Sequence, residues 1–313
     1  MNTLTISGGG YTAALLPNMG ANLVSLKYKE LDILHTPQNE ETLKNDPYSY
    51  GIPILCPPNK ISGAKFNYKG REFSYPVNMA DGACLHGVLH TANWKVVKHE
   101  PSCIVLSVSG KENEGIRNGF GENVEFFIEY SLSGDGLTQT VTAQNGEDYP
   151  VPFGLSFHTA FNVPFDKNSK KENILLKLPI SSRCKLNEKL YPALEDEPLQ
   201  EHEKLMATFG YEPLKQPIDM LYNRDMQKEN LLTLYDKSTG VKVCYKAGED
   251  YIYWVAWNDT ADRGFIGLEP QTWISNAPVY LEEGRGNYGV IEIAPHTSKS
   301  LSTNIFVTEE SAL

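Results

Sequence analysis

Two titratable residues interrupt otherwise apolar segments of the chain. His158 lies in Pro152–Pro164 (PFGLSFHTAFNVP), and Glu269 directly follows the apolar residues Phe265–Leu268. An imidazole exchanges its proton near neutral pH, and a buried carboxylate costs free energy unless it is paired or functional. The two residues therefore predict a general acid–base pair. The alternatives are a hydrogen-bonded core histidine and a surface glutamate beside a turn.

Amide and aromatic side chains follow Glu269 closely. The segment Gly264–Pro278 (GFIGLEPQTWISNAP) contains Gln271, Trp273 and Asn276. Planar amides donate and accept hydrogen bonds, and an indole ring can cover an apolar C–H face. Groups of these kinds bind sugar hydroxyls and sugar ring faces. We therefore predict that Gln271 and Trp273 contact a sugar.

A third unusual segment is the proline-rich run Gly51–Gly63 (GIPILCPPNKISG). Because prolines interrupt β-ladder pairing, this run is predicted to be irregular and to present Asn59 and Lys60. The triplet Leu85–Gly87, with His86 at its centre, follows downstream. Loops on a rigid scaffold carry binding residues disproportionately. The alternative is a surface loop with a solvated lysine.

No metal site and no cofactor site are predicted. His86 and His90 have the spacing of metal ligands on a helix, but Gly87 and the strand-rich context argue against a helix, and no acidic third ligand is near. The sequence has no P-loop, no G-x-S-x-G and no G-x-G-x-x-G after a strand. The predicted chemistry therefore uses side chains alone.

Composition narrows the class of protein. The 313 residues carry a formal net charge of −11, and 41% of them are hydrophobic, as in an ordinary globular protein. The negative charge disfavours nucleic acid and anionic membranes as partners. No apolar run approaches the length of a membrane span, and the first residues do not resemble a signal peptide. The five cysteines are odd in number, scattered along the chain and without C-x-x-C spacing. This pattern is typical of reduced thiols, so we expect a cytoplasmic protein.

Period-two alternation of apolar and polar residues dominates the chain. Val124–Leu132 and Leu137–Asn145 are predicted to form a hairpin about the turn Ser133–Gly136, and Leu231–Tyr235 and Val241–Tyr245 a second one. Further predicted strands are Leu4–Ser7, Asn22–Tyr28, Ile104–Ser109, Ile174–Leu178, Tyr251–Trp257, Val290–Ala294 and Leu301–Val307. The best helical candidate is Leu199–Ala207. Many strands with few helices predict an all-β, large antiparallel β-sandwich, with residues 1–313 as one domain.

Four motifs, taken in order, resemble the aldose 1-epimerase (galactose mutarotase) family. They are Asn59–Ile61, Leu85–Gly87 followed by Trp94, His158–Asn162 and Glu269–Thr272. The resemblance covers roughly residues 10 to 306. It implies the large sandwich known as a supersandwich.

The resemblance also implies roles for individual residues. His158 matches the family's general acid, Glu269 its general base and His86 a ligand-binding histidine. Asp219, in the segment QPIDMLYN, matches a sugar-binding aspartate.

The sequence departs from the family pattern at three places. The family's arginine is Lys60 here, and the Pro-Tyr after the catalytic histidine is Thr159–Ala160. A sugar-binding glutamine of some members has no clear counterpart in residues 251–258, where Tyr253, Trp254 or Trp257 could serve as a stacking surface. These changes keep the acid–base pair and leave the identity of the sugar open.

The predicted activity is interconversion of the α and β anomers of a free aldose such as glucose or galactose. Ring opening removes a proton from the O1 hydroxyl and delivers another to the ring oxygen. We expect a carboxylate and an imidazolium on opposite sides of C1 to do this without metal or cofactor. The only expected partner is the small-molecule sugar, and the protein is expected to be a monomer or a homodimer.

Two alternatives remain open at this point. An epimerase of hexose 6-phosphates would bring cationic residues, preferably arginines, to the phosphate, but the arginines are scattered along the sequence. A non-catalytic carbohydrate-binding protein on the same fold would have lost His158 or Glu269, and both are present.

Overall fold

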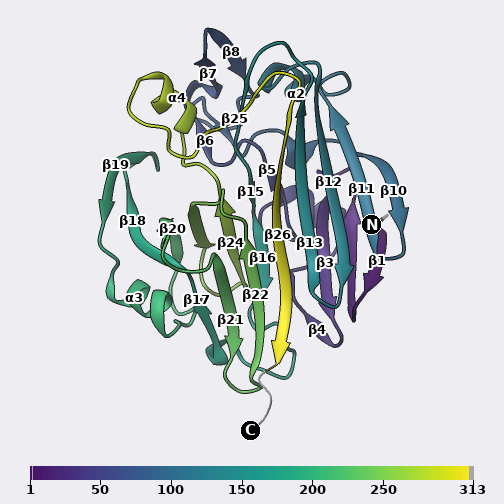
Figure 1. The fold of residues 1–313 in the computed structure, drawn as a ribbon. Coiled ribbons are helices and arrows are strands. Elements are labelled where there is room, and N and C mark those ends of the chain that lie inside the picture. Colours follow the sequence, from purple (N-terminus) through teal and green to yellow (C-terminus); the bar gives the residue numbers. More distant parts are fainter. Residues whose placement is uncertain (2, 310–313) are drawn as a thin grey trace.

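The computed structural model describes residues 1 and 3–309, and antiparallel strands are its dominant element (Figure 1). The predicted all-β fold class is confirmed. The first predicted hairpin forms from β12 (Val124–Ser133) and β13 (Gly136–Asn145), which leaves a tight two-residue connection. The second forms from β21 (Leu231–Asp236) and β22 (Val241–Ala247).

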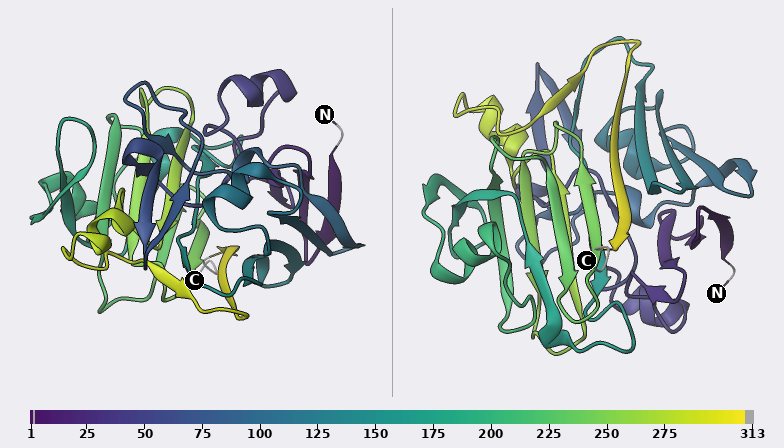
Figure 2. Two further views of the ribbon diagram at one scale, coloured as in Figure 1. Left: turned by 90° about the horizontal axis from the view of Figure 1, so that it is seen from above. Right: turned by 60° about the horizontal axis from the view of Figure 1, so that its bottom comes forward.

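The first of two large sheets has eight strands in the order β10-β11-β12-β13-β26-β22-β21-β17. Its long strands lie side by side in the right-hand view of Figure 2. Its remaining strands are β10 (Lys95–Glu100), β11 (Cys103–Ser109), β26 (Ser298–Glu309) and β17 (Ile174–Lys177).

A second sheet packs against the first and has the order β19-β18-β20-β23-β24-β15-β5, with β16 also paired to β24. Its strands are β19 (Pro192–Glu197), β18 (Ile180–Leu186), β20 (Ile218–Arg224), β23 (Tyr253–Asn258), β24 (Phe265–Gln271), β15 (Ser156–Phe157), β16 (Thr159–Asn162) and β5 (Ile54–Leu55).

Aromatic side chains fill the space between the two large sheets. The ring of Tyr245 on β22 lies 5.8 Å from Trp254 on β23 and 5.7 Å from Phe161 on β16. The Thr159 hydroxyl donates to the Tyr245 hydroxyl across the same space at 3.2 Å. Because neighbouring strand residues point to opposite faces, these contacts direct His158, Val255 and Trp257 away from the inter-sheet core.

Smaller elements flank this sandwich. A four-stranded N-terminal sheet contains β1 (Leu4–Gly8), β2 (Tyr11–Leu16), β3 (Asn22–Tyr28) and β4 (Leu31–Asp32). The short pairs are β14–β25 (Val151–Phe153 and Ile291–Ile293), β6–β9 (Lys60–Ile61 and Cys84–Leu85) and β7–β8 (Lys65–Tyr68 and Arg71–Ser74).

Helices are short and peripheral. They are α1 (Glu40–Asn45), α2 (Glu114–Gly119), α3 (Glu201–Thr208) and α4 (Ala277–Glu282), with single 3₁₀ turns at Ser62–Ala64, Leu89–Thr91 and Lys171–Asn173. Helix α3 occupies the one predicted helical segment, shifted by one or two residues at its ends. None of the helices in the described part of the chain is long and apolar enough to cross a membrane.

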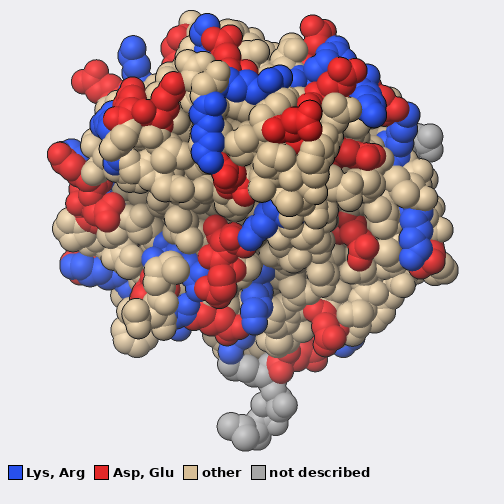
Figure 3. All heavy atoms as spheres, turned by 45° about the horizontal axis from the view of Figure 1, so that its top comes forward, with Lys and Arg blue, Asp and Glu red and all other residues tan. Residues whose placement is uncertain are grey.

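The surface carries charges of both signs. On the face shown in Figure 3, acidic and basic side chains are interspersed.

Candidate active site

A cavity of about 290 Å³ lies on the face of the second sheet that points away from the inter-sheet core. Strand register builds its floor. Leu221, Val255 and Glu269 are aligned across β20, β23 and β24. Asp219 and Trp257 occupy the adjacent row. Three antiparallel strands therefore bring residues from distant parts of the sequence to one surface.

His158 and Glu269 meet at this floor. The His158 Nε2 atom lies 3.2 Å from Glu269 Oε1, and both side chains are almost completely buried. His158 stands between β15 and β16, where its backbone N–H donates to Pro53 O at 3.0 Å. Gly267 makes room for its ring, since a Cβ there would lie only 3.0 Å from His158 Cε1. The two groups are therefore close neighbours on one side of the cavity, and their placement on opposite sides of a sugar C1 stays a prediction.

Burial has opposite effects on the two partners. It raises the pKa of the Glu269 carboxyl to about 8, against a smaller lowering by the Gln271 amide, and it lowers the pKa of the His158 imidazole to about 4. Between about pH 4 and about pH 8 the Glu269 carboxyl is protonated and the His158 imidazole is neutral. The pair then carries one exchangeable carboxyl proton and no net charge. A neutral pair with one movable proton can donate at one atom and accept at the other.

A short hydrogen-bond chain holds the carboxyl group in place. Gln271 Nε2 donates to Glu269 Oε2 at 2.8 Å, and Asn59 Nδ2 donates to Gln271 Oε1. Asn59 lines the cavity, whereas Gln271 is fully buried and does not. The structure thus places Gln271 behind Glu269, in contact with the predicted base and not with the cavity.

His86 lies on the opposite strand pair, just after β9, and lines the cavity. Its Nδ1 atom accepts the backbone N–H of Asn59 at 3.3 Å. Burial, together with His158, lowers the pKa of His86 well below its usual range, so the ring is neutral. Because Nδ1 accepts, the proton is on Nε2, and His86 can donate one hydrogen bond.

Lys60 and Asp219 supply the charged groups at the cavity wall. Lys60 Nζ donates to the carbonyl oxygen of Lys189 at 3.1 Å and lies 5.7 Å from the Tyr191 ring. Asp219 approaches from β20, and its charge contributes to the raised pKa of Glu269. The six predicted polar residues Asn59, Lys60, His86, His158, Asp219 and Glu269 therefore converge on one cavity.

Trp273 takes a different position from the one predicted. Its side chain is fully buried, does not line the cavity, and donates from Nε1 to Pro58 O at 3.0 Å. A Cβ at Gly154 would lie 2.3 Å from the indole Cδ2 atom, so glycine is required beneath the ring. Trp273 therefore holds the proline-rich segment from the interior of the protein, through its bond to Pro58. The prediction that Trp273 covers a sugar face is contradicted by this burial.

The aromatic side chains at the cavity are instead Trp257 and Tyr48. Of the three candidates in residues 251–258, Trp257 lies there, with its ring 5.3 Å from His158, whereas Trp254 is buried and donates to Asn230. Tyr48 follows α1, and no sequence motif pointed to it. Only its position among histidines reveals it, so the sequence carried no usable signal. The other apolar lining residues are Met79, Leu85, Leu186, Leu190, Leu221 and Val255.

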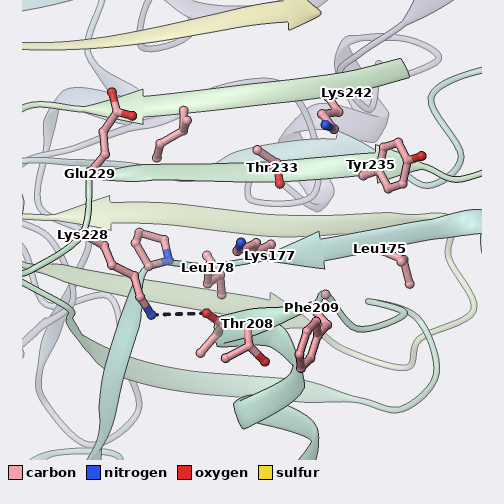
Figure 4. Close-up of a pocket in the computed structure, with 14 residues that line it drawn as sticks. Leu175, Lys177, Leu178, Thr208, Phe209, Lys228, Glu229, Thr233, Tyr235 and Lys242 are labelled. Carbon is pink, nitrogen blue, oxygen red and sulfur yellow. Dashed lines mark hydrogen bonds between the residues drawn. The ribbon is translucent and has the colours of Figure 1, made fainter. Parts of the chain in front are cut away.

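A larger groove of about 550 Å³ lies elsewhere, between the end of α3 and strands β17, β21 and β22 (Figure 4). It carries Lys177, Lys228 and Glu229 together with the strongly exposed Phe209. Lys228 Nζ donates to the Ala207 carbonyl oxygen at 3.3 Å. No buried carboxyl–imidazole pair is present among the residues that line this groove. Within residues 1 and 3–309, no group of three or more His, Cys, Asp or Glu side chains has a geometry suited to a metal ion.

The structure is a large antiparallel β-sandwich with a buried histidine–glutamate pair at the floor of a small cavity. The family model described as Aldose 1-epimerase matches residues 2–284. The chain belongs to this family.

The chain is also similar to solved structures and to curated proteins. A galactose mutarotase-like protein from Clostridium acetobutylicum superposes with a TM-score of 0.90 at 29% identity, covering 98% of this chain and 95% of that one. Galactose 1-epimerase from Lactobacillus acidophilus shares the fold, with a TM-score of 0.71 at 14% identity over 98% and 94% of the chains. The plasmid protein LacX of Lactococcus lactis is 23% identical over 93% of this chain and 92% of its own. The uncharacterized protein YihR of Escherichia coli is 24% identical, and that match spans about half of each protein, 50% and 49%.

Proposed function

We propose that this protein is an aldose 1-epimerase that interconverts the α and β anomers of a free aldose such as glucose or galactose. The observation that carries the proposal is the buried contact between His158 Nε2 and Glu269 Oε1 at 3.2 Å, at the floor of a cavity lined by groups suited to binding a sugar. Family membership supports the same reaction class.

The neighbouring placement of the pair suits the reaction. In a pyranose, O1 and the ring oxygen are both bonded to C1, so an acid and a base that act on them must lie close together. In the ionised arrangement of the pair, Glu269 takes the O1 proton while His158 protonates the ring oxygen. The C1–ring oxygen bond breaks, C1=O1 forms, and Glu269 is left protonated beside neutral His158.

The reverse steps close the ring on the other face after rotation about C1–C2. The pair gains and loses no proton over the cycle, so no cofactor is needed to balance it. The assignment of His158 as acid and Glu269 as base follows the family resemblance. The Gln271–Asn59 hydrogen-bond chain keeps one carboxyl oxygen occupied, which leaves Oε1 for proton transfer.

Polar groups around the pair are suited to hydroxyl recognition. His86 offers an Nε2–H donor, Asn59 an amide, Lys60 an ammonium group and Asp219 a carboxylate acceptor. Trp257 offers an aromatic face. Ligand pockets are typically about 300–1,000 Å³, so a cavity of about 290 Å³ fits a monosaccharide better than a longer chain.

The charge of the lining favours an unphosphorylated sugar. No arginine lines the cavity within the described residues, and the lysine that does, Lys60, already donates to a backbone carbonyl. A phosphate group would instead call for a cluster of cations.

Polarimetry of freshly dissolved α-glucose, α-galactose and glucose 6-phosphate tests the proposal. Wild-type protein should accelerate mutarotation of the neutral sugars with a higher kcat/KM than that of the phosphate. A clear preference for the phosphate would redirect the function to hexose 6-phosphates. Binding of sugars without any acceleration would show a non-catalytic carbohydrate-binding protein.

A further inference from the structure

Tyr48 occupies a position that the acid–base chemistry alone does not explain. Its ring lines the cavity and packs against two of the imidazoles, 4.8 Å from the ring of His86 and 5.6 Å from that of His158. Both contacts are within the usual range of aromatic pairs. Tyr48 is therefore the side chain that bridges the predicted acid and the predicted binding histidine.

The Tyr48 hydroxyl is held by a hydrogen bond to a residue outside the cavity lining. Tyr48 Oη and His90 Nε2 are hydrogen-bonded at 3.2 Å, and the two rings lie 5.5 Å apart. Burial raises the pKa of Tyr48 to about 12 and lowers the pKa of His90 to about 4, so both groups are neutral near pH 7. His90 does not line the cavity. The second histidine of the His86-x-x-x-His90 spacing thus has a partner and a place in the structure.

The backbone that carries Tyr48 is anchored on both sides. Before it, Asp46 pairs with Arg263 and accepts a hydrogen bond from Ser49 Oγ at 2.8 Å. After it, the Tyr50 ring stacks on His35 at 4.8 Å. Arg263 also binds Asp259 at 2.8 Å, which joins this segment to the loop before β24. A segment held at both ends gives its central side chain a defined orientation.

We propose that Tyr48 is a positioning residue of the acid–base pair, whose ring holds the His158 imidazole against Glu269 and keeps water away from it. The inference rests on the proposed function for its catalytic consequence, but the placement of the ring does not depend on which sugar is bound. His158 is faced by Glu269 from β24 and by His86 from the β9 side, with His90 and Asp46 farther away. The Trp257 ring packs on His158 from β23 at 5.3 Å, and Tyr48 closes a different side at 5.6 Å, where it also contacts His86 and can exclude water.

Two variants of Tyr48 separate its ring from its hydroxyl. Tyr48→Phe keeps the ring and loses only the bond to His90, and Tyr48→Leu removes the aromatic wall. With Tyr48→Leu, kcat should fall about 10- to 100-fold because the reacting group is no longer held in place. Tyr48→Phe should keep most of the wild-type kcat. KM should be nearly unchanged in both variants.

NMR titration of the His158 ring protons supplies a readout that does not need turnover. Once water reaches the imidazole, the pKa of His158 in Tyr48→Leu should move up toward its ordinary value by about one pH unit or more, and that in Tyr48→Phe should stay near the wild-type value. Tyr235→Leu, a half-buried tyrosine in the larger groove of Figure 4, is the matched control and should change neither kcat nor the titration.

The outcomes distinguish the two proposals. If wild-type protein turns over no aldose, the proposed function fails, and the His158 titration still tests the placement of Tyr48. If wild-type protein is active and Tyr48→Leu keeps both the wild-type kcat and the wild-type titration, the positioning role is overturned. A loss of thermal stability with neither change would also overturn it, because it would show a purely structural residue.

Discussion

Two cavities of this protein differ in the chemistry that their walls can support. The larger groove between α3 and the edge of the eight-stranded sheet has almost twice the volume, about 550 Å³ against about 290 Å³. Its charged groups are surface residues such as Glu229, which is paired with Lys246 at 2.7 Å and more than half exposed. The smaller cavity contains Glu269 and His158, both buried and 3.2 Å apart.

Burial of titratable groups, more than volume, distinguishes a site for proton transfer. Burial raises the pKa of Glu269 to about 8, and a perturbed pKa of this kind is typical of groups that transfer protons. The comparison between Glu269 and Glu229 can therefore be tested directly, because the same substitution can be made in both cavities.

The largest effect is expected from removing either member of the pair. Glu269→Gln and His158→Ala should each lower kcat by about 10²- to 10⁴-fold, the usual contribution of a general acid or base. Polarimetry with saturating aldose measures kcat, and circular dichroism checks that the fold survives. Glu229→Gln is the matched control and should keep wild-type activity. A folded Glu269→Gln or His158→Ala variant with near-wild-type kcat would remove that residue from the mechanism.

The pH dependence of kcat/KM should reflect the neutral pair. Above about 8, Glu269 loses the shared proton and no acid remains; below about 4, His158 gains a proton and no base remains. Activity should therefore be bell-shaped, with a plateau between these limbs that belong to the pair as a unit. Initial rates across this range give the profile, corrected for the uncatalysed reaction. A profile centred on an ordinary histidine pKa near 6.5 would contradict the burial argument.

Each of the two cavities has a lysine in its wall, Lys60 in the smaller and Lys177 in the larger, so the effect of removing one positive charge can be compared between them. Lys60→Ala should lower kcat/KM for all accepted aldoses about tenfold, the effect of losing one charged hydrogen bond. Lys60→Arg should change the ranking among sugars, because a planar fork binds two oxygens where an ammonium group binds one. Lys177→Ala, in the larger groove, should have no effect. If both Lys60 variants match wild type on every sugar, Lys60 does not contact substrate.

The smallest effect on activity is expected at Trp273. Trp273→Phe removes the hydrogen bond to Pro58 O and should destabilise the fold by about 1 kcal/mol in chemical denaturation. Because the indole does not reach the cavity, kcat/KM should change by less than a factor of about two. A tenfold loss of kcat/KM at unchanged stability would return Trp273 to the sugar site.

The local pattern of the sequence was sufficient for the fold class and for selecting His158 and Glu269. Period-two alternation with turn residues predicted the hairpins β12–β13 and β21–β22, because a half-buried strand must alternate. His158 and Glu269 could be selected because a titratable group inside an apolar segment is costly unless it is used. The family motifs added Asp219, which no local pattern singles out.

Tertiary structure decided which side chains share the cavity and which support it. Strand register aligns Leu221, Val255 and Glu269 and leaves Trp257, not Trp254, on the same face as the pair. Gln271 lies on the same face of β24 as Glu269 but is fully buried behind its hydrogen bond from Asn59, and Trp273, beyond the end of the strand, is buried against Pro58. Tyr48 could not be found from the sequence, because its contacts with His86, His90 and His158 join segments that only folding brings together.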